Sequence, residues 1–302
     1  LILDASKPTA LPLVGAFHAL GPVYEVKVHG SYAYVSCGWR SSLRLVELAD
    51  PANFHKAGGS LIEDLVTNFA LADHYAYLVI PDYGLLVMDI ATPTAPVAIG
   101  FLNLPGISAI KTGVGYAYAG DDNGTVWVLN LTDPAKPQKV ATYPALGYVG
   151  NMAVADGFAY LPDRNDLHLM TLADDGALTL VGRYPLDSYI RQITVVGQIA
   201  YVATTKQGLL LLDVSTPTKP VQVGRYTLSD VINDLTVTGD YAFLAVDEAG
   251  VYVLDIADPT QIKLVGHYQT PDAALTMTLA GDKLYVADQL AGLLILEFTL
   301  PR

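Results

Sequence analysis

Oxygen-bearing side chains recur along this sequence at a regular interval. They are Glu25, Asn68, Asn151, Gln192 and Asp234. Members of the set lie 41 to 43 residues apart, except for one gap of about twice that length. Carboxylate and amide oxygens are ligands that hard cations such as Ca²⁺ prefer. If repeated strands carry these residues to one opening, we expect a channel mouth that holds a cation or polar ligand. The alternative is a channel whose polar groups are satisfied by ordered water.

Large side chains in loops form a second group of candidates. Trp39, Arg40 and Tyr83 stand where equivalent loops carry small or acidic residues, and Arg191 joins them on the same expected face. A ring or guanidinium that no core requires is a typical binding residue, because it buries a large area with few rotatable bonds. The opposing interpretation is that these rings cover an apolar gap between neighbouring repeats.

The signatures of common enzyme active sites are missing from the sequence. The six histidines show no HExxH spacing, and there is neither a GxSxG elbow nor a Walker loop. The single cysteine, Cys37, has no obvious activating partner in sequence, so we expect a buried thiol. Acidic residues recur near the end of one strand, and we expect them to cap turns: Asp82, Asp121, Asp163, Asp247 and Asp288. Paired carboxylates acting as acid and base keep a hydrolase or lyase open as an alternative.

The elements that position these residues are set by an internal repeat. An aromatic-Ala-aromatic theme and its variants place their third residue at 34, 77, 118, 160, 201, 243 and 285, in steps of 41 to 43 residues. The apolar stretches are four to eight residues long, rich in Val, Ile, Leu and Tyr, and bounded by Gly, Asp, Asn or Pro, which is typical of strands. Four strands in about 42 residues, repeated seven times, predict an all-β, seven-bladed β-propeller.

The sixth repeat shows the four strands most clearly. We expect them at 232–238, 241–246, 250–256 and 263–268, and name them a, b, c and d. Strand a should line the central channel, and its third residue should face the axis by strand alternation. That position carries the five oxygen-bearing residues introduced above. The b–c turns and d–a loops then form one face of the protein, which we name the b–c face.

The end of strand c resembles a known repeat. The segments 85–93 (LLVMDIATP), 209–217 (LLLLDVSTP) and 251–259 (VYVLDIADP) are similar to the LVIVD repeat of predicted β-propellers from bacterial and archaeal proteins. The resemblance covers nearly the whole chain. It implies the propeller fold and an exported or surface-associated protein, and it assigns no catalytic residue. The fourth repeat departs from the motif at Thr171 and 174–176, where we expect an altered turn and a retained blade.

The order of the strands predicts how the chain ends meet. The stretch 13–17 has the pattern of strand d but precedes every a or b strand. We therefore expect a single domain over 1–302, in which residues 274–299 plus 11–18 build the last blade and protect its edge. Residues 1–4 also resemble strand c, and the copy joined to the last hairpin, 293–298, is the one we expect to be used.

Composition and net charge disfavour some classes of binding partner. Hydrophobic residues make up 52% and charged residues 16% of the chain, which excludes disorder. A net charge of -13 disfavours nucleic acid and anionic membranes, and no apolar run reaches 18 residues, so no transmembrane segment is expected. Because the chain starts at Leu1 and resembles exported proteins, we expect an extracellular or cell-surface location, with any signal or anchor outside the given sequence.

These observations predict a non-catalytic binding or scaffold propeller. It would engage a protein or carbohydrate partner through the b–c face, with no cofactor. The alternative is a metal-assisted hydrolase or lactonase-like propeller enzyme with a cation, such as Ca²⁺, at the channel mouth.

Overall fold

The computed structural model describes residues 11–19, 21–38, 41–49, 56–59, 66–113, 115–121, 123–144, 151–163, 165–173 and 175–298. These residues form seven four-stranded antiparallel sheets, the blades of a β-propeller, and one short 3-10 helix, η1 (Pro259–Gln261). The all-β, seven-bladed fold predicted from the repeat is therefore confirmed. Contacts along the chain define two compact units, unit 1 (Leu1–Leu65 with Gly224–Arg302) and unit 2 (Val66–Val223).

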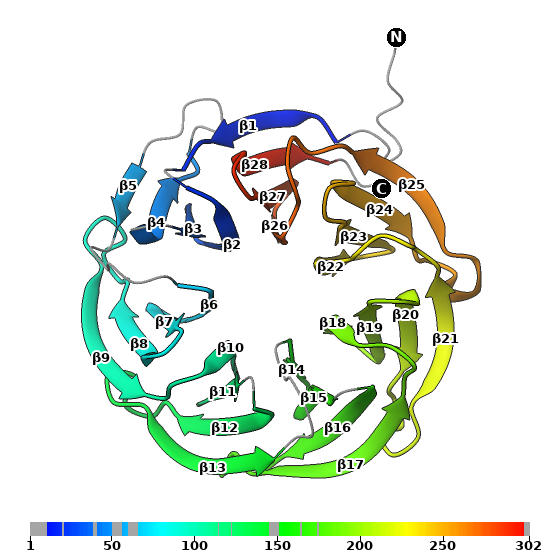
Figure 1. Cartoon of the computed structure of the whole chain (residues 1–302), viewed down its shortest axis with the longest axis horizontal. Coiled ribbons are helices and arrows are strands. Elements are labelled where there is room, and N and C mark those ends of the chain that lie inside the picture. Colours follow the sequence, from blue (N-terminus) through cyan, green and yellow to red (C-terminus); the bar gives the residue numbers. More distant parts are fainter. Residues whose placement is uncertain are drawn as a thin grey trace. The chain divides into compact units, whose positions relative to one another are not determined.

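Unit 1 contains three blades, whose strands are labelled in Figure 1. The first blade consists of β2 (Val23–His29), β3 (Tyr32–Cys37), β4 (Ser41–Glu47) and β5 (Lys56–Gly59). The sixth consists of β22 (Asp234–Thr238), β23 (Tyr241–Ala245), β24 (Val251–Asp255) and β25 (Lys263–Tyr268). The seventh consists of β26 (Thr276–Ala280), β27 (Lys283–Asp288), β28 (Gly292–Glu297) and β1 (Leu13–Phe17).

Unit 2 contains the other four blades. The boundary between the units falls within the last strand of the fifth blade, after Val223. The second blade consists of β6 (Asn68–Ala72), β7 (Tyr75–Ile80), β8 (Gly84–Asp89) and β9 (Val97–Asn103). The third consists of β10 (Ile107–Thr112), β11 (Tyr116–Asp121), β12 (Thr125–Asn130) and β13 (Gln138–Pro144). The fourth consists of β14 (Ala153–Ala155), β15 (Phe158–Asp163), β16 (Asp166–Leu172) and β17 (Leu178–Pro185). The fifth consists of β18 (Ile190–Val196), β19 (Ile199–Thr204), β20 (Gly208–Asp213) and β21 (Val221–Tyr226).

The N-terminal strand completes the seventh blade, as the strand order predicted. In Figure 1, β1 lies along β28, and the two pair antiparallel with Leu13 opposite Leu296 and Phe17 opposite Leu293. Leu11 is buried in the same core cluster as Phe298. The copy joined to the last hairpin therefore supplies strand c, while residues 1–4 lie outside the described residues. Whether the whole chain acts as one domain stays a prediction.

Strand b explains why the aromatic-Ala-aromatic theme repeats. It lies between strands a and c in each sheet, so both of its hydrogen-bonding edges are paired. Its residues are also nearly all buried, which matches their nearly continuous apolar run. In β7, every residue after Tyr75 is buried, including Ala76 and Tyr77. Burial raises the pKa of Tyr77 to about 12, with smaller contributions from Tyr75 and Asp73.

The c–d bends are held by the side chain of the last residue of strand c. The backbone N–H of Ser215 donates to Asp213 Oδ1 at 2.8 Å, and that of Ala257 donates to Asp255 Oδ1 at 3.1 Å. This local turn bond is the one expected of an Asp two residues ahead of its donor. In the fourth blade the altered turn uses Asp175 instead, whose Oδ1 accepts from Ala177 N at 2.9 Å, and the blade is retained as predicted.

Glycines in strand d allow neighbouring blades of unit 2 to touch backbone to backbone. A Cβ on Gly100 of β9 would lie 2.1 Å from the carbonyl oxygen of Ala135 in the next blade's c–d bend. A Cβ on Gly182 of β17 would lie 1.8 Å from the carbonyl oxygen of Pro217. Each glycine follows a β-bulge, where the register between strands c and d shifts. The bend of one blade is therefore seated directly on the outer strand of its neighbour.

Candidate functional site

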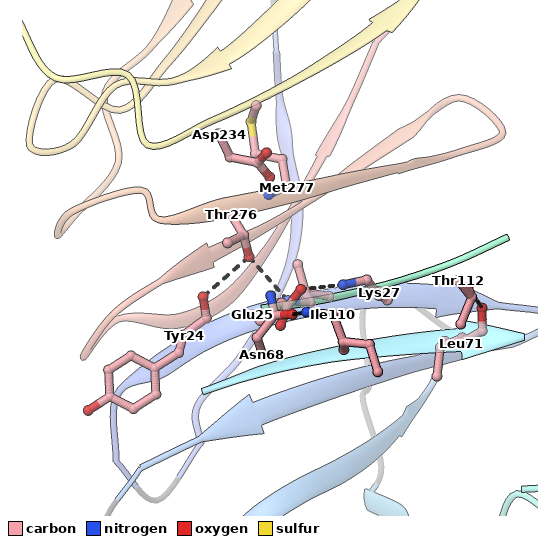
Figure 2. A network of polar contacts seen from close by, with 11 residues as sticks. Tyr24, Glu25, Lys27, Asn68, Leu71, Ile110, Thr112, Asp234, Thr276 and Met277 are labelled. Atoms are coloured by element: carbon pink, nitrogen blue, oxygen red, sulfur yellow. Dashed lines mark hydrogen bonds and ion pairs between the residues drawn. The ribbon is translucent and has the colours of Figure 1, made fainter. Parts of the chain in front are cut away.

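The third residue of strand a binds the backbone of the following blade. In unit 1, Asp234 is 7% exposed, and its Oδ2 accepts the backbone N–H of Met277 in the seventh blade at 2.8 Å. Its Oδ1 accepts the N–H of Leu235 at 2.8 Å. Thr276, at the same position of β26, accepts from Val26 N at 3.2 Å. It also donates to the carbonyl of Tyr24 at 3.3 Å, as Figure 2 shows.

The same connection recurs in unit 2. Asn68 Oδ1 accepts the backbone N–H of Ile110 in the third blade at 2.9 Å (Figure 2). Asn151 Nδ2 donates to the carbonyl of Arg191 in the fifth blade. The register of β18 shifts between Ile190 and Gln192, so Arg191 sits in a β-bulge, a place where the backbone leaves the regular ladder. We name these contacts between adjacent blades the inter-blade clips.

Gln192 and Glu25, the other two members of the predicted channel mouth, also make local bonds. Gln192 Oε1 accepts the N–H of Ile193 at 3.1 Å. Glu25 is buried and forms an ion pair with Lys27, two residues along β2 (Figure 2). The structure thus places four of the five residues within the first three positions of their strands and Asn151 two residues before β14, and it gives each an intramolecular partner. A cation or polar ligand among them stays a prediction. Among the described residues, no three or more His, Cys, Asp or Glu side chains are grouped as a metal ion would need.

Tyr83 is presented to solvent by a tight b–c turn in the second blade. Pro81 and Asp82 occupy the central positions of this turn, and Asp82 has a φ of 67°. The N–H of Tyr83 donates back to the carbonyl of Ile80 at 3.2 Å. Proline followed by a positive-φ residue is typical of a type II turn. Tyr83 is 57% exposed, and its role in binding stays a prediction.

A second exposed ring on the b–c face, Tyr189, was missed by the sequence analysis. It is 63% exposed, although its neighbours Ser188 and Ile190 are buried. Its carbonyl accepts the N–H of Thr205 at 3.0 Å, and Ser188 Oγ lies 3.1 Å from Thr205 Oγ1. The loop backbone is therefore anchored on both sides of the ring. The criterion that selected Tyr83, a large ring in a loop, would also have selected Tyr189.

Arg191 follows Tyr189 by two residues and is exposed, as its place in the bulge of β18 permits. The structure therefore brings one predicted binding residue next to an exposed tyrosine in the fifth blade. Trp39 and Arg40 lie outside the described residues, and their role stays a prediction. Cys37, which precedes them, is buried as expected.

The recurrent acidic residues at the end of strand b accept hydrogen bonds from different parts of the chain. Asp121 caps its turn as predicted, because its Oδ1 accepts from Asn123 N at 3.0 Å and from Thr125 N at 2.6 Å. Asp288 instead binds the d–a loop, and its Oδ2 accepts from Asp272 N at 3.0 Å. Burial raises the pKa of the Asp288 carboxyl above its usual range, against the lowering effect of hydrogen bonds from Asp272 and Thr270.

A histidine and a carboxylate are buried together in the fourth blade. His168 Nδ1 lies 3.4 Å from Asp163 Oδ2 and 3.5 Å from the hydroxyl of Tyr143. Both side chains are almost fully buried. Burial lowers the pKa of His168, which outweighs the opposing effect of the Asp163 carboxylate. The two side chains are 2% and 3% exposed, so neither is presented to solvent.

Comparison with known proteins supports the repeat assignment. The LVIVD repeat model matches residues 20–55, 66–103, 146–185, 189–228 and 232–270. Among curated proteins, no sequence matches this chain. The crystal structure of the computationally designed protein Ika8 is similar with a TM-score of 0.68 over 96% of this chain and 100% of that chain, at 9% sequence identity. At that identity the likeness concerns the fold alone. No helix in the described part of the chain is long and apolar enough to cross a lipid bilayer.

Proposed function

The chain belongs to the LVIVD repeat family, and on that premise we propose that it is a non-catalytic binding module. It engages a protein or carbohydrate partner through the b–c face, from an extracellular or cell-surface location. The observation that carries the proposal is the exposure of two tyrosines on anchored loops of unit 2, Tyr83 at 57% and Tyr189 at 63%. Rings held in this way lose little conformational entropy on binding.

The chemistry of this face suits both partner classes. A tyrosine ring offers an apolar surface to a sugar ring or an apolar side chain, and its hydroxyl offers a hydrogen bond. Arg191 adds a planar group that can bind carboxylates in a bidentate way. Burying the exposed part of one such ring removes on the order of 100 Å² from water, which contributes about 2–3 kcal/mol. Two such rings would together contribute about 4–6 kcal/mol, a large share of the roughly 8 kcal/mol of a micromolar contact.

The test screens the full chain against an array of glycans and a phage library of random peptides. Hits are compared between the wild type and the double variant Tyr83→Ser/Tyr189→Ser. The matched control is Val97→Ser, because Val97 is 58% exposed but lies on the outer strand β9. We expect hits that the double variant loses and the control keeps, at equal melting temperature. Hits that survive in the double variant, or a screen without hits, would contradict the proposal.

A further inference from the structure

A cavity opens between the fourth and fifth blades, at the end of the strands opposite to the b–c turns. Its volume is about 320 Å³, at the lower end of the ~300–1,000 Å³ typical of small-molecule sites. The a–b turns of both blades and the c–d bend of the fifth blade line it. All of these residues belong to unit 2. The cavity is thus separate from the b–c face discussed above.

The cavity wall combines apolar and polar groups, and several of its residues are held in place. Tyr160 and Val214 are buried core residues, and Pro217 belongs to the bend that is seated on Gly182. The N–H of Val214 donates to the carbonyl of Gln198, another lining residue, at 2.9 Å. A ligand would therefore meet a preformed surface and pay little to order it.

Phe158 distinguishes this blade from most of the others. At the first position of strand b, four other blades carry a tyrosine: Tyr32, Tyr75, Tyr116 and Tyr241. Phe158 lines the cavity and lacks the hydroxyl that the repeat supplies at this position. The departure removes a polar group from the wall and leaves an unsubstituted aromatic ring in its place.

A single carboxylate, Asp156, supplies the charge of the lining. It occupies the two-residue turn between Ala155 and Phe158 together with Gly157, and both turn residues have positive φ, 49° and 79°. This is the geometry of a type I′ hairpin turn, which fixes where the side chain starts. The pKa of Tyr160 is raised mainly by burial and further by the Asp156 carboxylate. The negative potential of Asp156 therefore reaches the aromatic wall.

We propose that this cavity binds a small organic cation, an amidinium, guanidinium or primary ammonium group carried on a flat or aliphatic body. Aromatic faces attract such cations, and a carboxylate adds a charge-assisted hydrogen bond. The net charge of -13 raises the local concentration of cations further. A neutral sugar would use the ring faces but gain nothing from the charge.

The test uses benzamidine as the cationic probe and benzamide as its neutral match of the same shape. Binding to the full chain is measured by calorimetry or by ligand-observed NMR at low salt. We expect benzamidine to bind about tenfold more tightly than benzamide, because one charge-assisted bond at a partly exposed site contributes on the order of 1.4 kcal/mol. Equal binding of the two probes, or binding of neither, would overturn the proposal.

Variants locate the site. Asp156→Asn should reduce benzamidine affinity to that of benzamide, and Phe158→Tyr should weaken both probes by restoring the repeat's hydroxyl. Asp73→Asn is the matched control, because Asp73 has the same positive φ in the a–b turn of the second blade. The control and the Tyr83→Ser/Tyr189→Ser variant should bind as the wild type does. Unchanged benzamidine affinity in folded Asp156→Asn protein would refute the assignment.

Discussion

Replacing Asp234 by alanine removes the inter-blade clip between the sixth and seventh blades. The buried carboxylate accepts two backbone N–H groups, from Leu235 and Met277, each at 2.8 Å. A hydrogen bond to a charged group contributes about 1.5–3 kcal/mol, and the N–H groups left behind are themselves unsatisfied. We therefore expect Asp234→Ala to lower the free energy of unfolding by about 3–5 kcal/mol.

A conservative variant of Asp234 and a control variant at a second aspartate refine this prediction. Asp234→Asn keeps one acceptor oxygen, so we expect about half of the alanine effect. Asp255→Ala serves as the matched control, because its carboxylate accepts one N–H, from Ala257, within a single blade. We expect it to cost about 1 kcal/mol.

The assay is equilibrium unfolding in urea, followed by circular dichroism and by intrinsic fluorescence. A lower midpoint at an unchanged slope reports lost stability, whereas a changed slope reports a change in the unfolding reaction itself. If Asp234→Ala unfolds within about 1 kcal/mol of the control, the clip contributes no more than a local turn does. The conclusion that these side chains join the blades would then be wrong.

Four further changes test other parts of the structure. Gly182→Ala forces a Cβ to 1.8 Å from the carbonyl oxygen of Pro217 and should lower the free energy of unfolding by about 1–3 kcal/mol. Gly113→Ala, whose Cβ would meet its nearest neighbours at ordinary distances of 3.4 and 3.5 Å, should change this free energy little. The pKa of buried His168 is lowered from 6.5. The free energy of unfolding should therefore fall as the pH drops below 6.5, by at most about 1.4 kcal/mol per pH unit, because the unfolded chain binds the proton more tightly. His168→Gln should flatten this slope between pH 7 and 5. The pKa of Asp288 is raised, so its protonated form stabilises the fold below pH 3.8, and this effect is lost as the pH rises through the folded pKa. Asp288→Asn should therefore raise the melting temperature relative to the wild type at pH 7, and raise it less at pH 3. Deleting residues 1–18 should expose the edge of β28 and cause aggregation, and a monomeric, equally stable product would contradict this role of β1.

The fold was predictable because its determinants are local and periodic. The bond from Ser215 N to Asp213 joins residues two apart, so the turn can be predicted from the motif alone. Strand b is likewise predictable from its own residues, because the aromatic-Ala-aromatic theme lies within it. The displaced strand at Leu13–Phe17 was predictable from strand order, because a strand d without its own a and b must pair elsewhere.

The inter-blade clips were not predictable in the same way. Asn68 binds Ile110, and both residues lie in stretches where sequence offers no sign of which side chain meets which backbone. An oxygen-bearing residue at a repeated position fits a ligand site and a structural bond equally well. The regular spacing was itself the missed signal, because a residue that recurs with the blades is a candidate for holding blades together. Tyr189 carries no such periodic signal, because its exposure depends on how the d–a loop folds between the buried Ser188 and Ile190.

The most direct test of the proposed function is the affinity of one selected glycan or peptide for the wild type and for Tyr83→Ser/Tyr189→Ser. Losing a true anchor costs about 2 kcal/mol or more, so the double variant should bind at least about 30-fold more weakly at an unchanged melting temperature. Val97→Ser should bind as the wild type does. An affinity within twofold of the wild type in the double variant, or a loss of affinity matched by a fall in melting temperature, would contradict a binding role for this face.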